Sequence, residues 1–404
     1  MKEDFDKVSK KIDFYEKEMI NTMRRMIEIK AISPLSGGRG ESERAEFLER
    51  TLKEWGFATK RYDYRDTTGT SRPNITTVMP GNNGERTVWV VAHMDTVSEG
   101  DISLWKTDPF NLTVKDGRLY GRGTLDNGQE VIAGMFALRA LKETGMKLRY
   151  NMGLALVADE ELGSRYGIEP LLKENIFTKN DMYVVPDWGN KKGDRIEVAE
   201  KGLLWLKITV LGKQVHASTP ANGVNAYRHA IRFLSRVDQV LHSKYNASNE
   251  IFVPKTSTFE MTKHEKNVDS VNIVPGREVS YIDCRVLPQY DLDEVINDVN
   301  EVAREKEFEE VKIVVEVFNR EDAAPQTEEN AEVVQMLKTA LLDLRKIKAP
   351  LLGIGGGTCA AFFRKKGFSA AAWSTEDRVE HEPDEYALVE NMLNDAKVLA
   401  YLPI

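Results

Sequence analysis

Histidine and carboxylate side chains follow several apolar runs of the sequence, at spacings suited to acid-base or metal chemistry. In VVAHMDTV, His93 and Asp95 stand two residues apart at the end of such a run. Residues two apart in a strand face the same side, so both can reach one crevice, where Asp95 can orient His93 as carboxylates do for metal-bound histidines. When the motif is taken alone, a polar strand cap is the favoured explanation of the pair.

Three adjacent carboxylates follow another apolar run, in VADEELGS. They are Asp159, Glu160 and Glu161, and no basic residue is interleaved among them. Like charges repel and burial disfavours ionisation, so this run predicts a compensating cation close by. A solvated acidic turn is the alternative.

Three further candidates lie in YGRGTLDNG, MYVVPDWG and VEHEPDEY: Asp126, Asp187 and His381. Each is unremarkable by itself, and Asp126 could simply cap the helix that follows it. Together, all these groups lie at strand ends or helix starts of one expected α/β layer, where open sheets bind ligands. Two histidines and several carboxylates suit zinc or a similar divalent ion, with one carboxylate to spare as a base.

The elements that must position these groups alternate between helix and strand over residues 1–200. Apolar spacing predicts helices over 5–29, 41–57 and 127–144, and apolar runs predict strands in NITTVMP, RTVWVVAH, YNMGLALVAD and DMYVVPD. NLTVKDGRLYGRG predicts a hairpin that turns at Asp116-Gly117. This order predicts an α/β fold with a mixed, mainly parallel sheet and helices on both faces.

The middle of the chain has a different order. From Leu203 it reads strand, helix, strand, strand, helix, strand, which is the split βαβ, ferredoxin-like arrangement. A helix over 328–344, the Gly-rich loop GIGGGT, the strand SAAAW and a helix over 384–399 complete the chain. We therefore expect a discontinuous α/β domain over 1–200 and 320–404, with a second domain inserted at 201–319.

Composition narrows the class of protein. The 404 residues carry a net charge of −8, with a pI near 5.5, which argues against a nucleic-acid partner. No apolar run is long enough to span a membrane, and the charged start MKEDFDKVSKKIDFYEKEM lacks the apolar core of a signal peptide. The two cysteines, Cys284 and Cys359, predict no disulfide framework, so we expect a cytoplasmic protein.

The sequence resembles a known family of di-zinc deacylases and exopeptidases. The family includes acetylornithine deacetylase, succinyl-diaminopimelate desuccinylase, aminoacylase and bacterial glutamate carboxypeptidase. The likeness covers nearly the whole chain, through VVAHMDTV, DGRLYGRGTLDN, ADEELGS, KGLLWLKITVLGKQVHAS, NIVPG, DCRV, GGGT and HEPDEY. It implies the zinc-exopeptidase fold, with residues 1–200 and 320–404 as the catalytic, metal-binding domain and 201–319 as a lid. It also implies a homodimer formed through that lid.

The resemblance also implies roles for individual residues. His93, Asp187 and a bridging Asp126 would hold one divalent ion, and Asp126, Glu161 and His381 the other. The ions would be zinc, with cobalt or manganese as alternatives. Asp95 would orient His93, the peptide after Asp126 would be cis, and Glu160 would act as general base and acid toward a water shared by the metals.

Other family positions imply contacts with the substrate. His216 matches a lid histidine that stabilises the oxyanion in the partner's active site of dimeric members. Arg285 and Asn272 match lid positions that bind the substrate's carboxylate or the reacting oxygen, and Gly356, Gly357 and Thr358 match a pocket loop. Arg285 could instead be the exposed side of its strand, and the glycines a helix entry. Cys359 departs from the Asp that many relatives carry after Gly-Gly-Thr.

The expected reaction is hydrolysis of the amide bond of a small N-acyl amino acid or a dipeptide. Two alternatives stay open: a carbamoyl-amino-acid or allantoate-type amidohydrolase of the same family, and a non-catalytic metal-binding relative. A dinucleotide-dependent enzyme lacks support, because no dinucleotide fingerprint follows a predicted strand.

Overall fold

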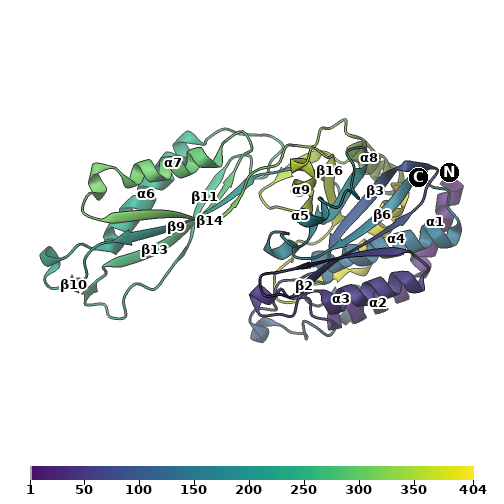
Figure 1. The fold of residues 1–404 in the computed structure, drawn as a ribbon, viewed down its shortest axis with the longest axis horizontal. Coiled ribbons are helices and arrows are strands. Elements are labelled where there is room, and N and C mark those ends of the chain that lie inside the picture. Colours follow the sequence, from purple (N-terminus) through teal and green to yellow (C-terminus); the bar gives the residue numbers. More distant parts are fainter. Residues whose placement is uncertain (1) are drawn as a thin grey trace. The chain divides into compact units, whose positions relative to one another are not determined.

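The computed structural model describes residues 2–404, with side chains from Asp4 onward, and divides into two compact units (Figure 1). Unit 1 comprises the chain up to residue 198 together with 326–351 and 358–404, and unit 2 comprises 199–325 and 352–357. The lid segment expected at 201–319 lies inside unit 2. Its assignment as a lid, and that of the remainder as a catalytic domain, stay predictions.

Unit 1 is built on a mixed sheet with the strand order β1-β2-β6-β3-β7-β16-β8-β15. β6, β3, β7 and β16 run parallel at its centre, and β2 and β8 pair antiparallel with this central group. The strands are β1 Thr59–Arg65, β2 Ser71–Met79, β3 Asn83–His93, β6 Tyr150–Val157, β7 Met182–Asn190, β8 Ile196–Glu200, β15 Leu351–Ile354 and β16 Ala370–Thr375.

The central strands are apolar because both faces of the sheet are covered. In β3, Val88 and Val90 pack into one core cluster while Trp89 and Val91 pack into another. Successive side chains of a strand point to opposite faces, so a strand covered on both sides needs apolar residues at every position. β6 is accordingly buried along its whole length. The runs that predicted these strands carry this signal.

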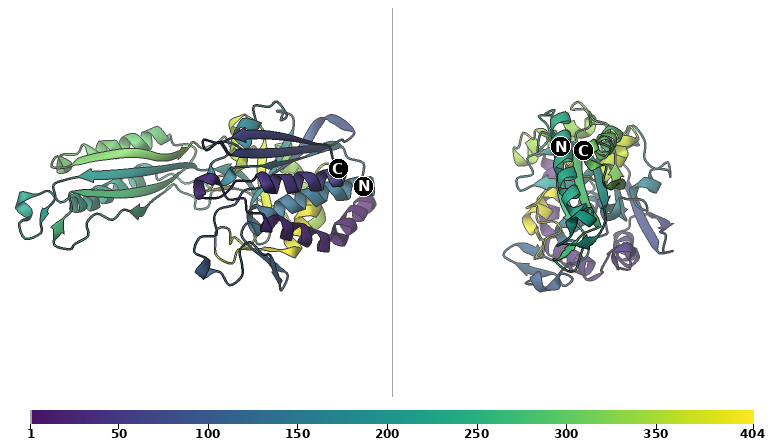
Figure 2. Two further views of the ribbon diagram at one scale, coloured as in Figure 1. Left: turned by 60° about the horizontal axis from the view of Figure 1, so that its bottom comes forward. Right: turned by 90° about the vertical axis from the view of Figure 1, so that its left-hand side faces the viewer.

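Helices lie on both faces of the sheet (Figure 2). One face is covered by α1 Lys2–Phe14, α2 Glu16–Glu28, α3 Ser42–Glu54, α4 Gln129–Thr144, α8 Glu332–Arg345 and α10 Val389–Tyr401. The other is covered by α5 Ile168–Leu171 and α9 Cys359–Lys365. α1 and α10 are in contact, and the two chain ends lie side by side in Figures 1 and 2. The predicted α/β fold, with a mixed sheet between helices, is confirmed.

Several element bounds differ from the sequence prediction. The helix expected over 5–29 is two helices that meet at the buried Tyr15, and the last helix starts at Val389 because β17, Tyr386–Leu388, pairs with β5. β1 and β8 were not predicted. In β1, TKRYDYR is an edge strand rich in charge, and only one of its seven positions is buried, so its apolar signal is weak.

The predicted hairpin is confirmed. β4 Thr113–Lys115 and β5 Arg118–Tyr120 pair antiparallel, with Lys115 opposite Arg118. Asp116 and Gly117 between them have φ of 51° and 73°, the positive values that a two-residue hairpin turn of type I′ requires.

Unit 2 contains a four-stranded antiparallel sheet in the order β11-β13-β9-β14. Its elements are β9 Gly202–Leu211, α6 Ala226–Lys244, β11 Thr258–His264, β13 Arg277–Val286, α7 Leu292–Ala303 and β14 Lys312–Glu321. α6 and α7 pack against the sheet in one core cluster. This is the predicted ferredoxin-like arrangement. Across residues 2–404, no helix combines the length and apolar character that crossing a membrane requires.

Candidate metal centre

His93 lies at the carboxyl end of β3 and is almost fully buried. Its Nδ1 is 3.1 Å from the carbonyl oxygen of Asp95, and its Nε2 is 2.8 Å from Oδ1 of Asp126. A bond from Nδ1–H to that carbonyl selects the tautomer whose Nε2 is free to bind a metal. The backbone of Asp95 therefore helps to orient His93.

Asp126 lies between the two histidines of the predicted site. Its Oδ1 faces His93, and its Oδ2 is 3.1 Å from Nε2 of His381. The Asp126-Asn127 peptide is cis, as the resemblance implied. Asp126 does not cap the following helix, because Gly128 occupies the N-cap of α4. One carboxylate that faces two imidazoles has the arrangement that a bridging ligand needs.

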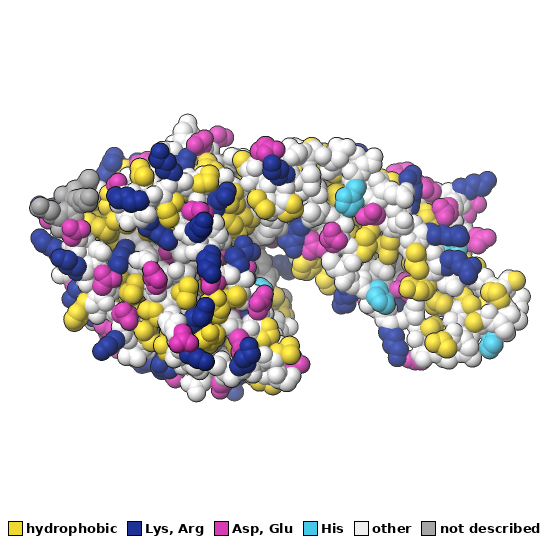
Figure 3. Space-filling view, turned by 180° about the vertical axis from the view of Figure 1, so that it is seen from behind, with side chains coloured by type: hydrophobic (Ala, Val, Ile, Leu, Met, Phe, Trp, Pro, Cys, Tyr) yellow, Lys and Arg dark blue, Asp and Glu magenta, His cyan; other side chains and the backbone are white. Residues whose placement is uncertain are grey.

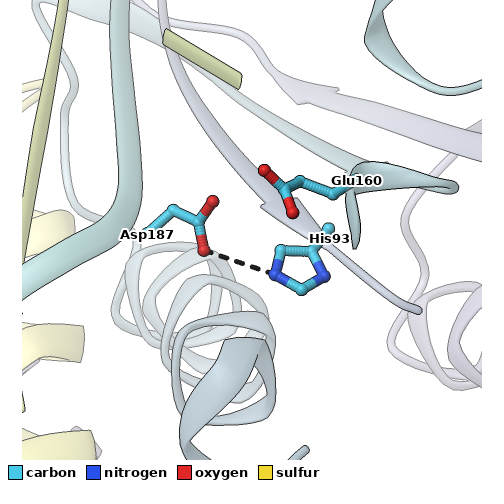
Figure 4. A group of neighbouring side chains, drawn as sticks. All are labelled: His93, Glu160 and Asp187. Atoms are coloured by element: carbon cyan, nitrogen blue, oxygen red, sulfur yellow. Dashed lines mark ion pairs between the residues drawn. The ribbon is translucent and has the colours of Figure 1, made fainter. Parts of the chain in front are cut away.

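His93, Glu160 and Asp187 form the first of two groups that can hold a metal ion; we call it the inner trio (Figure 4). One ligand atom from each residue lies within 4.8 Å of the other two, and the three side chains point toward one another. Asp187 Oδ1 is 3.3 Å from Nε2 of His93. Asp187 also accepts a hydrogen bond of 2.9 Å from the side-chain amide of Asn127.

Asp126, Glu161 and His381 form the second group, the outer trio. Glu161 Oε2 lies 3.1 Å from Nε2 of His381. The His381 side chain is 52% exposed, whereas that of His93 is 1% exposed. The structure thus brings together all six residues predicted to be metal ligands or base, in two adjoining trios.

The carboxylate of Asp95 holds the turn that carries both glutamates. Its Oδ1 and Oδ2 accept hydrogen bonds from the backbone N–H groups of Glu160 and Glu161, at 3.0 and 3.1 Å. Oδ1 is also 3.5 Å from Nδ1 of His93. Asp95 therefore links the end of β3 to the acidic turn, in addition to the orienting role that was predicted from its spacing.

The electrostatics of the cluster favour bound cations. Burial, with the charge of Asp187 adding to it, raises the pKa of Glu160 well above its usual range, and burial together with Asp126 raises the pKa of Glu161 to about 7. Bonds to Asp126 and Glu161 raise the pKa of His381 to about 11. In the chain alone, protons on histidine partly neutralise the excess of acid. A divalent ion would neutralise it more fully, and the imidazole and carboxylate donors suit zinc, cobalt or manganese.

The predicted lid residues lie in unit 2 and form two separate groups. His216 in β10, Val215–His216, pairs with Ile273 of β12, Ile273–Val274, so it lies beside Asn272. Both side chains are exposed; His216 Nδ1 is 2.7 Å from Ser218 Oγ, and Asn272 Oδ1 accepts a bond from Ser270.

Arg285 lies toward the other end of β13, opposite Leu203, whereas Arg277 at the start of β13 is opposite Leu211. At a rise of about 3.3 Å per residue, Arg285 is roughly 26 Å from that start. Its guanidinium bonds to Asp283 and donates to the carbonyl of Gly355 at 2.8 Å. Arg285 therefore lies beside the glycine-rich loop rather than beside His216 and Asn272.

The glycine-rich loop connects the two units in sequence. Gly356 and Gly357 belong to unit 2, and a Cβ on either would meet no close neighbour. Thr358 belongs to unit 1, where its hydroxyl accepts the N–H of Ala360 at 3.1 Å and caps α9. Cys359 follows, buried beside Ser164, and burial raises the pKa of its thiol well above the usual range.

Three residues that contact the site were not singled out from the sequence. Asn127 bonds to Asp187, and Glu385 with Arg122 bonds to the loop that carries Asp126. Asn127 and Arg122 flank Asp126 in GRGTLDN, and Glu385 stands in HEPDEY, both quoted motifs. Only their presence inside those motifs could have indicated them, because these residue types are common at surfaces.

Comparison with known proteins identifies the family. The family model described as "Peptidase family M20/M25/M40" matches residues 89–403. The chain belongs to this family. It is 37% identical over 401 residues to an uncharacterized metallohydrolase of Methanocaldococcus jannaschii. The aligned region covers 94% of this chain and 97% of the relative.

The chain is also similar to proteins with named activities, at lower identity. The succinyl-diaminopimelate desuccinylase of Pelagibacter ubique is 24% identical over 388 residues, covering 94% of this chain and 96% of its own length. The crystal structure of human carnosine dipeptidase 1 superposes with a TM-score of 0.77 at 19% identity, covering 98% of each chain. The resemblance found in the sequence is confirmed. The protein is an M20 metallohydrolase, a hydrolytic enzyme that acts on amide or peptide bonds.

Proposed function

We propose that the protein hydrolyses the amide bond of a small N-acyl amino acid or dipeptide-like substrate, using two divalent ions. One would lie at His93 and Asp187 of the inner trio and the other at the outer trio, with Asp126 shared between them. The observation that carries this proposal is the position of Asp126, whose two carboxylate oxygens face His93 and His381 separately. His93 and Asp187 with Asp126 would hold one ion, and Glu161 and His381 with Asp126 the other. Bound there, divalent ions would polarise the substrate carbonyl and lower the pKa of a water molecule.

Glu160 is the residue to which we assign proton transfer. Its carboxylate lies in the inner trio but belongs to neither predicted ligand set, and its raised pKa favours a group that can both take and return a proton. It would accept a proton from the attacking water and deliver it to the nitrogen of the leaving amine. General acid-base catalysis of this kind contributes about 100- to 10,000-fold.

Glu160→Gln tests this assignment. The side chain keeps its size but cannot take the proton, so kcat falls by about 100-fold or more while two metal ions per chain remain bound. Glu130→Gln is the matched control, because Glu130 is a buried glutamate of unit 1 outside both trios. Loss of one metal ion from Glu160→Gln would show instead that Glu160 is a ligand, and an unchanged rate would overturn the base assignment.

The substrate class follows from a panel of compounds. Zinc-, cobalt- and manganese-loaded protein is incubated with N-acetyl and N-succinyl amino acids, dipeptides and N-carbamoyl amino acids. A free acyl acid or two amino acids as products supports the proposal. Release of ammonia and carbon dioxide would place the protein among carbamoyl hydrolases. Absence of hydrolysis across the whole panel would overturn the proposed function.

We also propose that unit 2 mediates a homodimer in which His216 donates to the carbonyl oxygen in the partner's active site. β14 is an edge strand, and its Val317 and Phe318 are 47% and 60% exposed; Tyr227 and Ile231 of α6 are also exposed. Exposed apolar groups beside an unpaired strand edge favour self-association.

Acidic and basic side chains are interspersed on the face drawn in Figure 3, which fits a small substrate better than a polyanion.

Mixing inactive variants tests the dimer. His216→Ala and Glu160→Gln each lack one contribution, so a mixed dimer regains one complete site if His216 acts across the interface. We expect activity to return when the two are mixed, together with a dimer mass in sedimentation. No recovery in demonstrably mixed dimers would mean that His216 acts within its own subunit or not at all.

A further inference from the structure

We propose that Glu385 and Arg122 form a positioning pair that fixes the outer trio, by holding the loop of Asp126 and the backbone of His381 at the same time. The inference rests on the proposed two-metal function. Neither residue is a predicted metal ligand, and neither is among the residues predicted to bind the substrate.

The carboxylate of Glu385 is enclosed by the loop that ends at Asp126. Oε1 accepts hydrogen bonds from the backbone N–H groups of Leu125 and Asp126, at 2.9 and 3.1 Å, and Oε2 accepts one from Gly123 at 3.1 Å. Glu385 is 1% exposed. Three backbone donors around one buried carboxylate fix the course of residues 123–126, and so the direction in which the Asp126 side chain leaves the backbone.

Arg122 connects this loop to the backbone of His381. Its Nη1 donates to Oε2 of Glu385 at 2.6 Å, and its Nη2 donates to the carbonyl oxygen of His381 at 3.1 Å. Arg122 is 2% exposed. One buried ion pair therefore restrains two of the three residues of the outer trio, Asp126 through its own N–H and His381 through its own carbonyl.

The outer trio needs such support more than the inner one. His381 has a φ of 64° in a turn, and its ring is half exposed, so strand pairing and close packing do not hold it as they hold His93. The third member, Glu161, depends on a different residue, because its N–H donates to Asp95. No hydrogen bond links Glu385 or Arg122 to His93, Glu160 or Asp187 among the described residues. The pair therefore supports two ligands of the outer ion, Asp126 and His381, but only one ligand of the inner ion, the shared Asp126.

A purely structural role is the alternative, and the chain offers a matched control. Glu197 and Arg364 form another buried ion pair of unit 1, with bonds of 2.9 and 2.6 Å and a fully buried Glu197. Glu197→Gln removes the same charge from a buried ion pair that lies on β8 and not in the segment of residues 122–126. It measures what the loss of a buried carboxylate does to the fold alone.

The experiment titrates full-length, metal-free protein with Co²⁺, and follows both the calorimetric isotherm and the visible absorption of the bound ion. We expect the unmodified protein to bind two equivalents. In Glu385→Gln an amide NH₂ replaces one acceptor oxygen, so it faces donors instead of accepting from them. Binding of the outer Co²⁺ ion should weaken by about 10- to 100-fold, the size typical for partners of metal ligands. Binding of the inner ion should weaken less, because only the shared Asp126 connects it to the pair.

Glu197→Gln should lower the melting temperature yet leave the affinity for both Co²⁺ ions unchanged. If Glu385→Gln does not fold, Arg122→Lys serves in its place, because lysine keeps the charge but cannot bond to Glu385 and His381 together. Arg122→Lys should lower the affinity for the same Co²⁺ ion by a smaller factor. Combining the two substitutions should cost little more than Glu385→Gln alone, since the pair acts as a unit.

The outcomes separate the two proposals. If the unmodified protein binds two equivalents and the Glu385→Gln and Arg122→Lys variants bind both as tightly, or if Glu197→Gln loses affinity equally, the positioning pair is overturned and the proposed function stands. If the unmodified protein binds no Co²⁺, the proposed function fails, and the positioning role fails with it.

Discussion

The inner and outer trios use the same donor chemistry on different supports. His93 ends a central strand of the sheet and its side chain is 1% exposed, whereas His381 comes from a turn and its side chain is 52% exposed. Two residues of the inner trio, His93 and Asp187, are therefore fixed by the sheet, whereas His381 of the outer trio depends on side-chain bonds to the turn that carries it. The difference predicts two metal ions of unequal affinity and exchange rate, with the inner one held more tightly.

The largest expected effect follows from removing the imidazole of the inner trio. His93→Asn deletes a buried donor and leaves Asp187 and Asp126 facing each other, so the affinity for the inner ion should fall by more than the roughly 100-fold that loss of an outer partner costs. Hydrolysis should fall below detection in the panel assay. Bound metal per chain, measured after dialysis, checks this. His242→Asn, at an exposed histidine of α6, should match the unmodified protein. Retention of two tight equivalents by His93→Asn would remove His93 from the site.

A smaller effect is expected from the outer trio. His381→Asn should weaken one equivalent by about 10- to 100-fold, and the exposed position of His381 should let a chelator remove that ion first, even from the unmodified protein. Following Co²⁺ absorption during chelator titration should therefore show two steps. A single step, or a first step that His381→Asn leaves unaltered, would contradict the ranking of the two trios.

The next effect concerns the support of the inner trio. Asn127 donates to Oδ1 of Asp187 at 2.9 Å and to the carbonyl of Pro186 at 2.8 Å, so Asn127→Ala removes the bond that orients Asp187. We expect about a tenfold loss for the inner ion only, the opposite selectivity to Glu385→Gln. Calorimetric titration with Co²⁺ distinguishes the two variants. Loss of the same equivalent in both would mean that the trios are not separately supported.

Parts of this site were predictable from local sequence, for a definite reason. His93 and Asp187 lie at the ends of apolar runs, and an apolar run marks both a buried central strand and the edge where it stops. At Asp126 the local pattern, a glycine-rich turn before a long helix, favoured a helix cap, and its role as a bridging ligand was implied by the resemblance. The family and the mixed α/β fold could also be predicted, because motifs in the same order extend along nearly the whole chain.

The supporting bonds could not be predicted, because they join distant parts of the chain. Arg122 and Glu385 are 263 residues apart, and nothing in the local pattern of either indicates the other. The edge strand β1 was missed for a different reason: it is polar and little buried, so hydrophobic periodicity does not reveal it. The separation of Arg285 from His216 within unit 2 likewise depends on strand register, which the residue types alone do not determine.

The smallest effect on activity, and the clearest on stability, is expected at a buried acid pair outside both trios. Glu130 on α4 and Asp395 on α10 are both buried, and Gln129 donates to Glu130 Oε1 at 2.7 Å. Burial, with the charge of Asp395 adding to it, raises the pKa of Glu130 well above its usual range, and burial raises the pKa of Asp395 to about 6. This pair shows what burial does to carboxyl groups where no histidine lies among them.

Because these pKa values are raised on folding, the native state binds more protons than the unfolded chain between pH 4 and the raised values. The stabilisation is then complete in acid, and it is lost as the pH rises through about 6 and beyond. Glu130→Gln cannot ionise, so its stability relative to the unmodified protein should rise with pH. The rise should be about 1.4 kcal/mol for each pH unit between the ordinary and the raised pKa of Glu130, and the difference should be small below pH 5. Chemical denaturation at pH 5 and pH 8 measures the difference, while kcat and metal content should stay unchanged. Equal stability differences at both pH values would mean that folding does not raise the pKa of Glu130, and so that burial by itself does not raise the pKa of this carboxyl group.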